Sequence, residues 1–126
     1  MNNICITGRL TSTPEIKKTT SGVSVCSINV AVDRDYKVNG EKATDFIPCV
    51  FWRGTAEFVA KYFGKGDMIA VVGSLESRQY KDKSGNNRTV WEVKADKANF
   101  CGGKKEQEKQ QENVAYEEIT DDILPF

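Results

Sequence analysis

Four aromatic residues in this sequence stand among positively charged ones. The aromatic residues are Tyr36, Phe46, Trp52 and Tyr80, and the neighbouring cations are Arg34, Lys37, Arg53 and Arg78. A nucleic-acid base stacked on an aromatic ring gains roughly 1–3 kcal/mol whatever its identity, while cations bind the phosphates of the backbone. A single tyrosine among charges is usually no more than an exposed tyrosine. Four aromatic residues close to cations instead indicate a surface for single-stranded nucleic acid.

Residues that commonly catalyse reactions or bind metals are sparse. The chain has no histidine, and its four cysteines, Cys5, Cys26, Cys49 and Cys101, lie far apart without a Cys-x-x-Cys pair. A zinc site of ordinary ligand spacing is therefore not expected, and the commonest general base is absent. We expect no catalytic residues, no metal and no cofactor, and we expect free thiols in a reducing compartment.

One stretch of sequence, DFIPCVFW, has to position two of the aromatic residues. Alternate side chains of a β-strand point to opposite faces, so Phe46 and Trp52 share one face, while Ile47, Cys49 and Phe51 share the other. Both faces are apolar, whereas a strand of a small antiparallel sheet normally has one polar face in water. The second face must be covered by another sheet, another subunit or a flat ligand stacked on the two rings.

The other segments predict a β-rich chain with one helix. Alternating apolar residues predict strands over 3–10, 23–33, 68–81 and 88–95, and residues 98–101 are a candidate to close the sheet. The polar segment 34–44 contains the turn signal Asn39-Gly40, so we expect a loop there. Thr55 is a suitable N-cap for a helix that reaches about Phe63.

The order of these elements predicts the fold. About five strands in an all-β chain, with one short helix between the third and fourth strands, are typical of the five-stranded OB-fold barrel. The 126 residues, 39% of them hydrophobic, suffice for one domain. Apolar runs are far shorter than the roughly 20 residues of a membrane helix, and no basic segment precedes an apolar one at the N-terminus. We therefore expect a cytoplasmic protein.

The net charge is zero but unevenly distributed. Residues 1–103 contain 15 lysines and arginines against 11 acidic residues, and residues 104–126 contain 3 against 7. A mildly basic body with an acidic tail is common in proteins that bind polyanions, although a solvated tail without a function is the alternative. We place the domain over 1–103 and expect a disordered linker over 104–119, because its Gln, Glu and Lys residues cannot form a core.

The last seven residues, 120–126, differ from this linker. Two acidic residues lead into an apolar end, and the residues concerned are Asp121, Asp122, Ile123, Leu124, Pro125 and Phe126. This tip either folds back onto the core of its own chain or serves as a peptide ligand, whose terminal ring and carboxylate dock in a partner's pocket.

Four segments resemble one known family, the bacterial single-stranded DNA-binding proteins. ITGRLTSTPEI resembles the opening strand of that family, and TDFIPCVFWRGTAEFVAKYFGKGD resembles its third strand, helix and Lys-Gly turn. GSLESRQYKDKSGNNR resembles its long hairpin, and DDILPF resembles its acidic C-terminal tip. The resemblance extends over the whole length of the chain, and four segments in the family's order that end in this tip make it specific.

The resemblance implies a homotetramer of OB-folds that wraps single-stranded DNA and performs no catalysis. By position, the family's stacking residues fall on the same four aromatic residues. Arg9, Lys65 and Arg78 match positions that are basic in the family and would meet phosphate. The tip would bind replication, recombination and repair proteins, and the protein would associate with the nucleoid.

The sequence also departs from these relatives. Pro48, Gly54, Glu76 and Gln79 stand where a basic or larger polar residue is frequent, and two of the stacking tryptophans common in relatives are tyrosines here. Two other functions remain open. One is an OB-fold for RNA, although the short aromatic-rich strand motifs of a cold-shock module are missing. The other is an adaptor whose barrel supports protein contacts made by the tail.

Overall fold

The computed structural model describes residues 1–101 of the chain, and the predicted linker and tip lie outside these residues. Six strands and one helix follow one another along this part of the chain. They are β1 (Ile4–Leu10), β2 (Lys17–Lys18), β3 (Ser24–Val38), β4 (Glu41–Trp52), α1 (Arg53–Tyr62), β5 (Met68–Lys81) and β6 (Asn87–Phe100).

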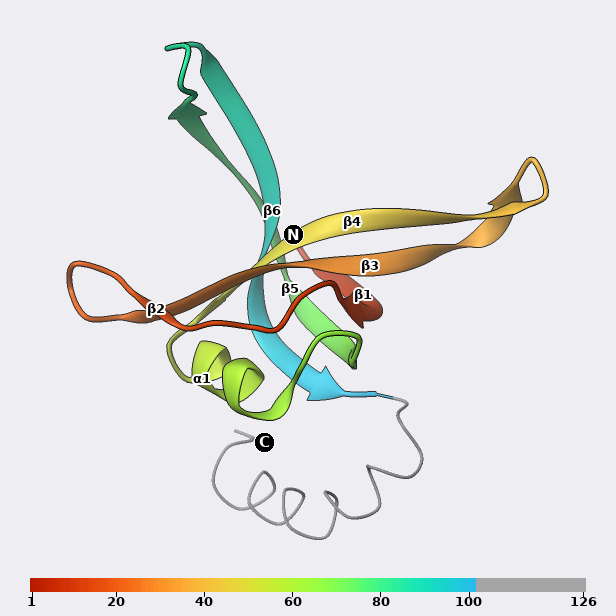
Figure 1. Ribbon diagram of the computed structural model, residues 1–126, viewed down its shortest axis with the longest axis horizontal. Helices are drawn as coiled ribbons and strands as arrows, with labels where there is room; N and C mark the ends of the chain where they lie inside the picture. The colour runs from red at the N-terminus through yellow and green to blue at the C-terminus, as the bar shows by residue number, and fades with distance from the viewer. Residues whose placement is uncertain (102–126) are drawn as a thin grey trace, which may run out of the picture.

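Strand β1 closes the sheet into a barrel. The strand order is β1-β5-β6-β4-β3, and β1 also pairs with β3, where Arg9 stands opposite Ala31. Neighbouring strands are antiparallel, except that β4 and β6 run parallel. The short β2 pairs with β3 outside this ring. The predicted five-stranded barrel is therefore confirmed, with α1 between its third and fourth strands (Figure 1).

Alternating side chains of the five strands fill the barrel. These side chains form one buried cluster. Four strands, β3, β4, β5 and β6, each contribute a fully buried residue to it, namely Val30, Phe51, Ile69 and Val93. Strands β1 and β3 approach closely at Gly8, where an added Cβ atom would lie 2.8 Å from Cγ1 of Val30. Real Cβ atoms essentially never come this near, so a glycine is needed where the barrel closes.

Helix α1 packs against β3, β4 and β6 at one end of the barrel. Phe58 and Val59 are buried there, and the ring of Phe58 meets that of Phe100 edge-on, with 5.6 Å between centroids. The predicted N-cap at Thr55 is wrong. The chain turns at Arg53, with φ of 56°, directly from β4 into the helix, so Thr55 already lies inside it.

Within residues 1–101, this helix is too short and too polar to cross a membrane.

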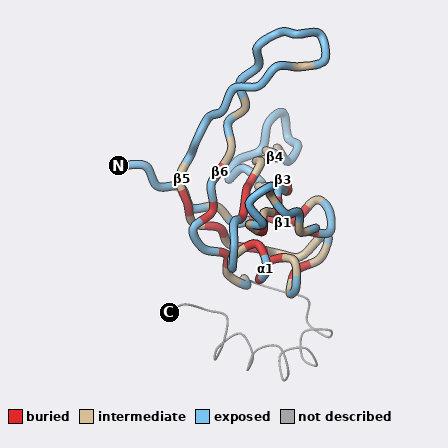
Figure 2. Tube along the Cα trace, turned by 90° about the vertical axis from the view of Figure 1, so that its left-hand side faces the viewer, coloured by how far each residue is buried: buried red, intermediate tan, exposed pale blue. Residues whose placement is uncertain are grey.

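Two hairpins extend from the barrel, and we call them the β3–β4 arm (residues 33–45) and the β5–β6 arm (residues 76–92) (Figure 1). Buried residues gather in the barrel, whereas both arms are mostly exposed (Figure 2). The predicted loop over 34–44 is wrong, because the strands continue to a two-residue turn. Asn39 and Gly40 form this turn with φ of 52° and 78°, as a type I′ turn requires. The two strands stay paired through their backbones although most side chains of the arm are polar. The sequence therefore lacks the alternation of apolar and polar residues that would have indicated a strand there.

Candidate nucleic-acid interface

The outer face of β4 carries two exposed aromatic side chains. Phe46 is 64% exposed and Trp52 is 38% exposed, whereas Phe51 on the inner face is fully buried. Phe46 stands opposite Ala31 of β3, and Trp52 stands opposite Val25. Cross-strand partners share a face, so each ring has a shorter side chain beside it. Rings that rise above their neighbours in this way are accessible for base stacking.

An arginine lies in the same cross-strand row as Phe46. Ala31 pairs with Phe46 on one side and with Arg9 of β1 on the other, so the three residues cross adjacent strands. Neighbouring strands are about 4.8 Å apart, which places the backbones of Arg9 and Phe46 about 10 Å apart. Nη1 of Arg9 donates a hydrogen bond to the carbonyl of Gly66 at 3.2 Å, next to Lys65. The structure thus places Arg9 in the row of Phe46, and it places Lys65 next to the residue that Arg9 contacts.

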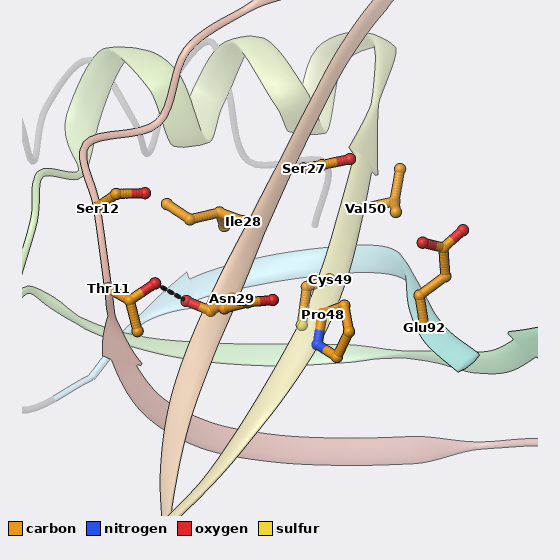
Figure 3. Close-up of a pocket in the computed structure, with 9 residues that line it drawn as sticks. All are labelled: Thr11, Ser12, Ser27, Ile28, Asn29, Pro48, Cys49, Val50 and Glu92. Carbon is orange, nitrogen blue, oxygen red and sulfur yellow. Dashed lines mark hydrogen bonds between the residues drawn. The ribbon is translucent and has the colours of Figure 1, made fainter. Parts of the chain in front are cut away.

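A hollow of about 260 Å³ opens on this outer face. Pro48 and Val50 line it, and they hold the outward positions of β4 between Phe46 and Trp52. The loop that follows β1 lies on one side of the hollow, and Glu92 of β6 lies on the other (Figure 3). Both polar and apolar groups border the hollow, a mixture that suits a base with its sugar.

Tyr36 lies on the β3–β4 arm with 61% of its surface exposed. The guanidinium carbon of Arg34 is 6.0 Å from the ring centroid, and Nη1 donates a hydrogen bond to the tyrosine hydroxyl at 3.2 Å. Nε and Nη2 of Arg34 donate to the two carboxylate oxygens of Asp45, each at 2.9 Å. These bonds hold the pKa of the Asp45 carboxyl below its usual value. Arg34 thus has an acidic partner that its local sequence does not indicate.

Tyr80 on the β5–β6 arm has a similar environment. The residue is 47% exposed, and the guanidinium carbon of Arg78 lies 5.8 Å from the ring centroid. Nε of Arg78 donates to Oε1 of Glu92 at 3.0 Å. Only 16% of the Glu92 side chain is exposed, compared with 61% for Arg78. The carboxylate therefore lies at the base of the arm, where it also borders the hollow.

The remaining predicted cations are exposed at three separate places in the fold. Arg53 is exposed directly after Trp52, and Lys65 is exposed in the turn that precedes β5. Lys37 lies near the tip of the β3–β4 arm, where it pairs in register with Lys42. The predicted site residues do not form one compact cluster. They extend from the barrel face onto both arms, an arrangement that fits an extended ligand better than a small one.

A second tryptophan is exposed that the sequence analysis did not select. Trp91 is 58% exposed and stands opposite Ser77, whereas Tyr80 stands opposite Arg88. Since residues 77 and 80 are an odd number of positions apart on one strand, Trp91 and Tyr80 point to opposite faces of the arm. The only signal for Trp91 was its position in a polar hairpin. For Asp45 and Glu92 the only sequence signal was the repeated spacing Arg-x-Tyr, which does not show which acid lies beside each arginine.

Two of the four thiols lie in the core and offer little chemistry. Cys26 and Cys49 are buried, and burial raises the pKa of Cys49 to about 12, so its thiol stays protonated at neutral pH. Among residues 1–101, no three His, Cys, Asp or Glu side chains gather into an arrangement that could hold a metal ion. Stacking, hydrogen bonding and charge are the interactions that this surface offers to a ligand.

A family model described as the single-strand binding protein family matches residues 1–101. This match covers all the residues that form the barrel and both arms. It includes the four aromatic residues and every predicted cation.

Several curated proteins are similar to the chain. A single-stranded DNA-binding protein of Caldanaerobacter subterraneus subsp. tengcongensis is 38% identical over 138 residues, covering 100% of this chain and 92% of the relative. Single-stranded DNA-binding protein 1 of Clostridium acetobutylicum is 42% identical over 108 residues, covering 84% and 98%. Single-stranded DNA-binding protein 1 of Lactococcus lactis is 34% identical over 149 residues, covering 100% and 99%.

Proposed function

The chain belongs to the single-strand binding protein family, and we propose that it binds single-stranded DNA without sequence preference by stacking bases on four aromatic side chains. These are Tyr36, Phe46, Trp52 and Tyr80. The observation that carries this proposal is the outer face of β4, where two rings are exposed on a strand whose inner face fills the core. Every base has a flat π-face, so stacking tolerates any sequence.

The cations supply the second part of the binding. Arg9, Arg53 and Lys65 are exposed close to the barrel face, and Lys37 is exposed on the β3–β4 arm. Each phosphate that a cation neutralises releases a counterion, so the affinity should fall as the salt concentration rises. A protein of this kind binds and protects its ligand and needs no catalytic residue.

Tryptophan fluorescence tests this proposal. In a Trp91→Phe variant, Trp52 is the only tryptophan, and we expect poly(dT) to quench its emission in a saturable manner at low salt and less as salt is added. The matched control is Trp52→Phe, in which Trp91 is the only reporter and quenching should be small. An absence of saturable quenching in both the wild type and Trp91→Phe at low salt would refute the proposal. Competition with poly(U) distinguishes DNA from RNA as the preferred ligand.

We also propose that four copies of the chain assemble, as the family resemblance implies. Three large apolar side chains that do not lie on the outer face of β4 support an assembly, because they are exposed in the single chain. They are Leu75, Trp91 and Phe100. Light scattering with and without a (dT) oligomer would measure both the oligomeric state and the stoichiometry. A monomer mass at micromolar concentration would contradict the assembly without affecting the stacking proposal.

The third part of the proposal concerns the tip, Asp121 to Phe126, which lies outside the described residues. We propose that it recruits replication, recombination and repair proteins in the cytoplasm, at the nucleoid. Deleting residues 121–126 should leave DNA affinity unchanged or higher while abolishing partner binding. A loss of DNA binding on deletion would show that the tip is part of the DNA site.

A further inference from the structure

The two arms repeat one arrangement of three side chains. On the β3–β4 arm these are Asp45, Arg34 and Tyr36, and on the β5–β6 arm they are Glu92, Arg78 and Tyr80. In both arms the arginine precedes the tyrosine by two residues, and the acid comes from the partner strand. We call each arrangement an acid–arginine–tyrosine triad.

The first triad uses the whole guanidinium of Arg34. Its Nε and Nη2 atoms bind both carboxylate oxygens of Asp45, and its Nη1 atom binds the hydroxyl of Tyr36. The paired Nε and Nη2 edge is the one with which an arginine holds a phosphate by two parallel hydrogen bonds. Asp45 therefore occupies the edge that a DNA phosphate would need.

The second triad is less symmetric. A single hydrogen bond joins Nε of Arg78 to Glu92, and the carboxylate is largely withdrawn from water while the arginine remains exposed. Glu92 borders the hollow on the barrel face, so its negative charge lies close to the proposed path of the DNA (Figure 3). Without Arg78, this carboxylate would oppose a phosphate directly.

Fold stability does not explain why the same triad occurs twice, each time beside an exposed tyrosine. The Arg34–Asp45 pair is exposed on both sides, and such pairs contribute only about 0–1 kcal/mol to stability. Arg78 is itself exposed, although its partner Glu92 is largely withdrawn from water. Both pairs lie at or near the arms, outside the core cluster. Their position next to the proposed stacking surface points to a role in binding.

We propose that Asp45 and Glu92 are built-in competitors of DNA phosphate, which hold Arg34 and Arg78 against the tyrosine rings until a phosphate replaces the carboxylate. This inference rests on the proposed function. In the free protein the arginine beside each tyrosine is then not available to phosphate, and these two arginines add less to the affinity than their number suggests. The carboxylates of Asp45 and Glu92 thereby lower the affinity for DNA and make it fall less steeply as the salt concentration rises.

The variants Asp45→Asn and Glu92→Gln test this inference. Each removes one competing charge while preserving the size of the side chain. We expect each to bind a (dT) oligomer several-fold more tightly at low salt, measured by fluorescence anisotropy of a labelled oligomer. The plot of log affinity against log salt should steepen by up to about 0.7 for each arginine released.

Two control variants remove a charge without releasing an arginine. Asp35→Asn acts on the β3–β4 arm, and Glu76→Gln acts directly opposite Glu92 on the same face of the β5–β6 arm. Within residues 1–101, neither Asp35 nor Glu76 forms an ion pair. We expect a smaller gain in affinity for these controls and an unchanged salt slope.

A double-mutant cycle separates competition from a structural role. Arg34→Met should weaken binding much more in the Asp45→Asn background than in the wild type, because only there is the arginine available for phosphate. If Asp45→Asn and Glu92→Gln match their controls or weaken binding, the inference is overturned while the proposed function stands. If the wild type shows no saturable binding of the oligomer, the proposed function fails and the inference fails with it.

Discussion

The two faces of β4 differ in their surroundings although both are apolar. On the inner face, Cys49 and Phe51 have no exposed surface and belong to the barrel core. On the outer face, the rings of Phe46 and Trp52 remain accessible on either side of a hollow. Apolar residues on the two faces of this one strand therefore have different roles. The inner ones hold the barrel together, and the outer ones are available to a ligand.

The largest effect should follow truncation on the inner face. Phe51→Ala removes a fully buried ring, and we expect the free energy of unfolding to fall by about 3–5 kcal/mol. Urea denaturation followed by circular dichroism measures this loss. The matched control is Phe46→Ala, the same change on the outer face of the same strand, which should cost much less stability. Equal losses for both variants would show that the two faces are not separate.

A smaller effect, of a different kind, should follow truncation on the outer face. Trp52→Ala removes a proposed stacking platform, so the affinity for a labelled (dT) oligomer should fall about 5- to 150-fold, corresponding to roughly 1–3 kcal/mol. Its loss of folding stability should stay below that of Phe51→Ala, because the ring is partly exposed.

Trp91→Ala is the control for Trp52→Ala, since Trp91 is an exposed tryptophan on the face of the β5–β6 arm opposite Tyr80. We expect less than a twofold change in affinity for this variant. A loss as large as that of Trp52→Ala would extend the DNA path onto both faces of the arm and would show that the two tryptophans do not differ in role.

The smallest effect concerns the reactivity of a thiol on the inner face. Because burial raises the pKa of Cys49 to about 12, iodoacetamide at pH 8 should alkylate this residue only as fast as the protein unfolds. Cys5, which is exposed in the single chain, provides the reference rate, and urea should bring both residues to similar rates. Mass spectrometry of the digested protein measures the modification of each cysteine. Rapid labelling of Cys49 in the native protein would contradict its place in a closed core.

The sequence predicted the barrel well where apolar residues alternate. The strand over 68–81 has the predicted bounds, and the turn at Asn39-Gly40 lies where its two residues indicated. Prediction failed in the mostly polar β3–β4 arm, because hydrogen bonds between strands do not depend on apolar alternation. The predicted start of the helix at Thr55 was also wrong. The helix begins after a sharp turn at Arg53, and a search for capping residues does not detect such a turn.

The acidic partners of the arginines could not be read from local sequence. Arg34 and Asp45 are 11 residues apart, and Arg78 and Glu92 are 14 residues apart. Whether such residues meet depends on strand register, and a shift of one position would turn each acid to the opposite face. The four aromatic residues were easier to identify, because cations near them in the sequence and the two apolar faces of DFIPCVFW are local features that need no distant partner.

The sequence by itself determined that β4 has two apolar faces, because the alternation of side chains is a local property of an extended chain. Only the tertiary structure decided which face is buried, because that depends on the pairing of β1 with β3 and the closure of the barrel around Phe51. The same closure places Arg9 in one row with Ala31 and Phe46, from three strands that are distant in the sequence. The sequence contains the aromatic and charged residues, and the register between distant strands determines which of them lie next to one another.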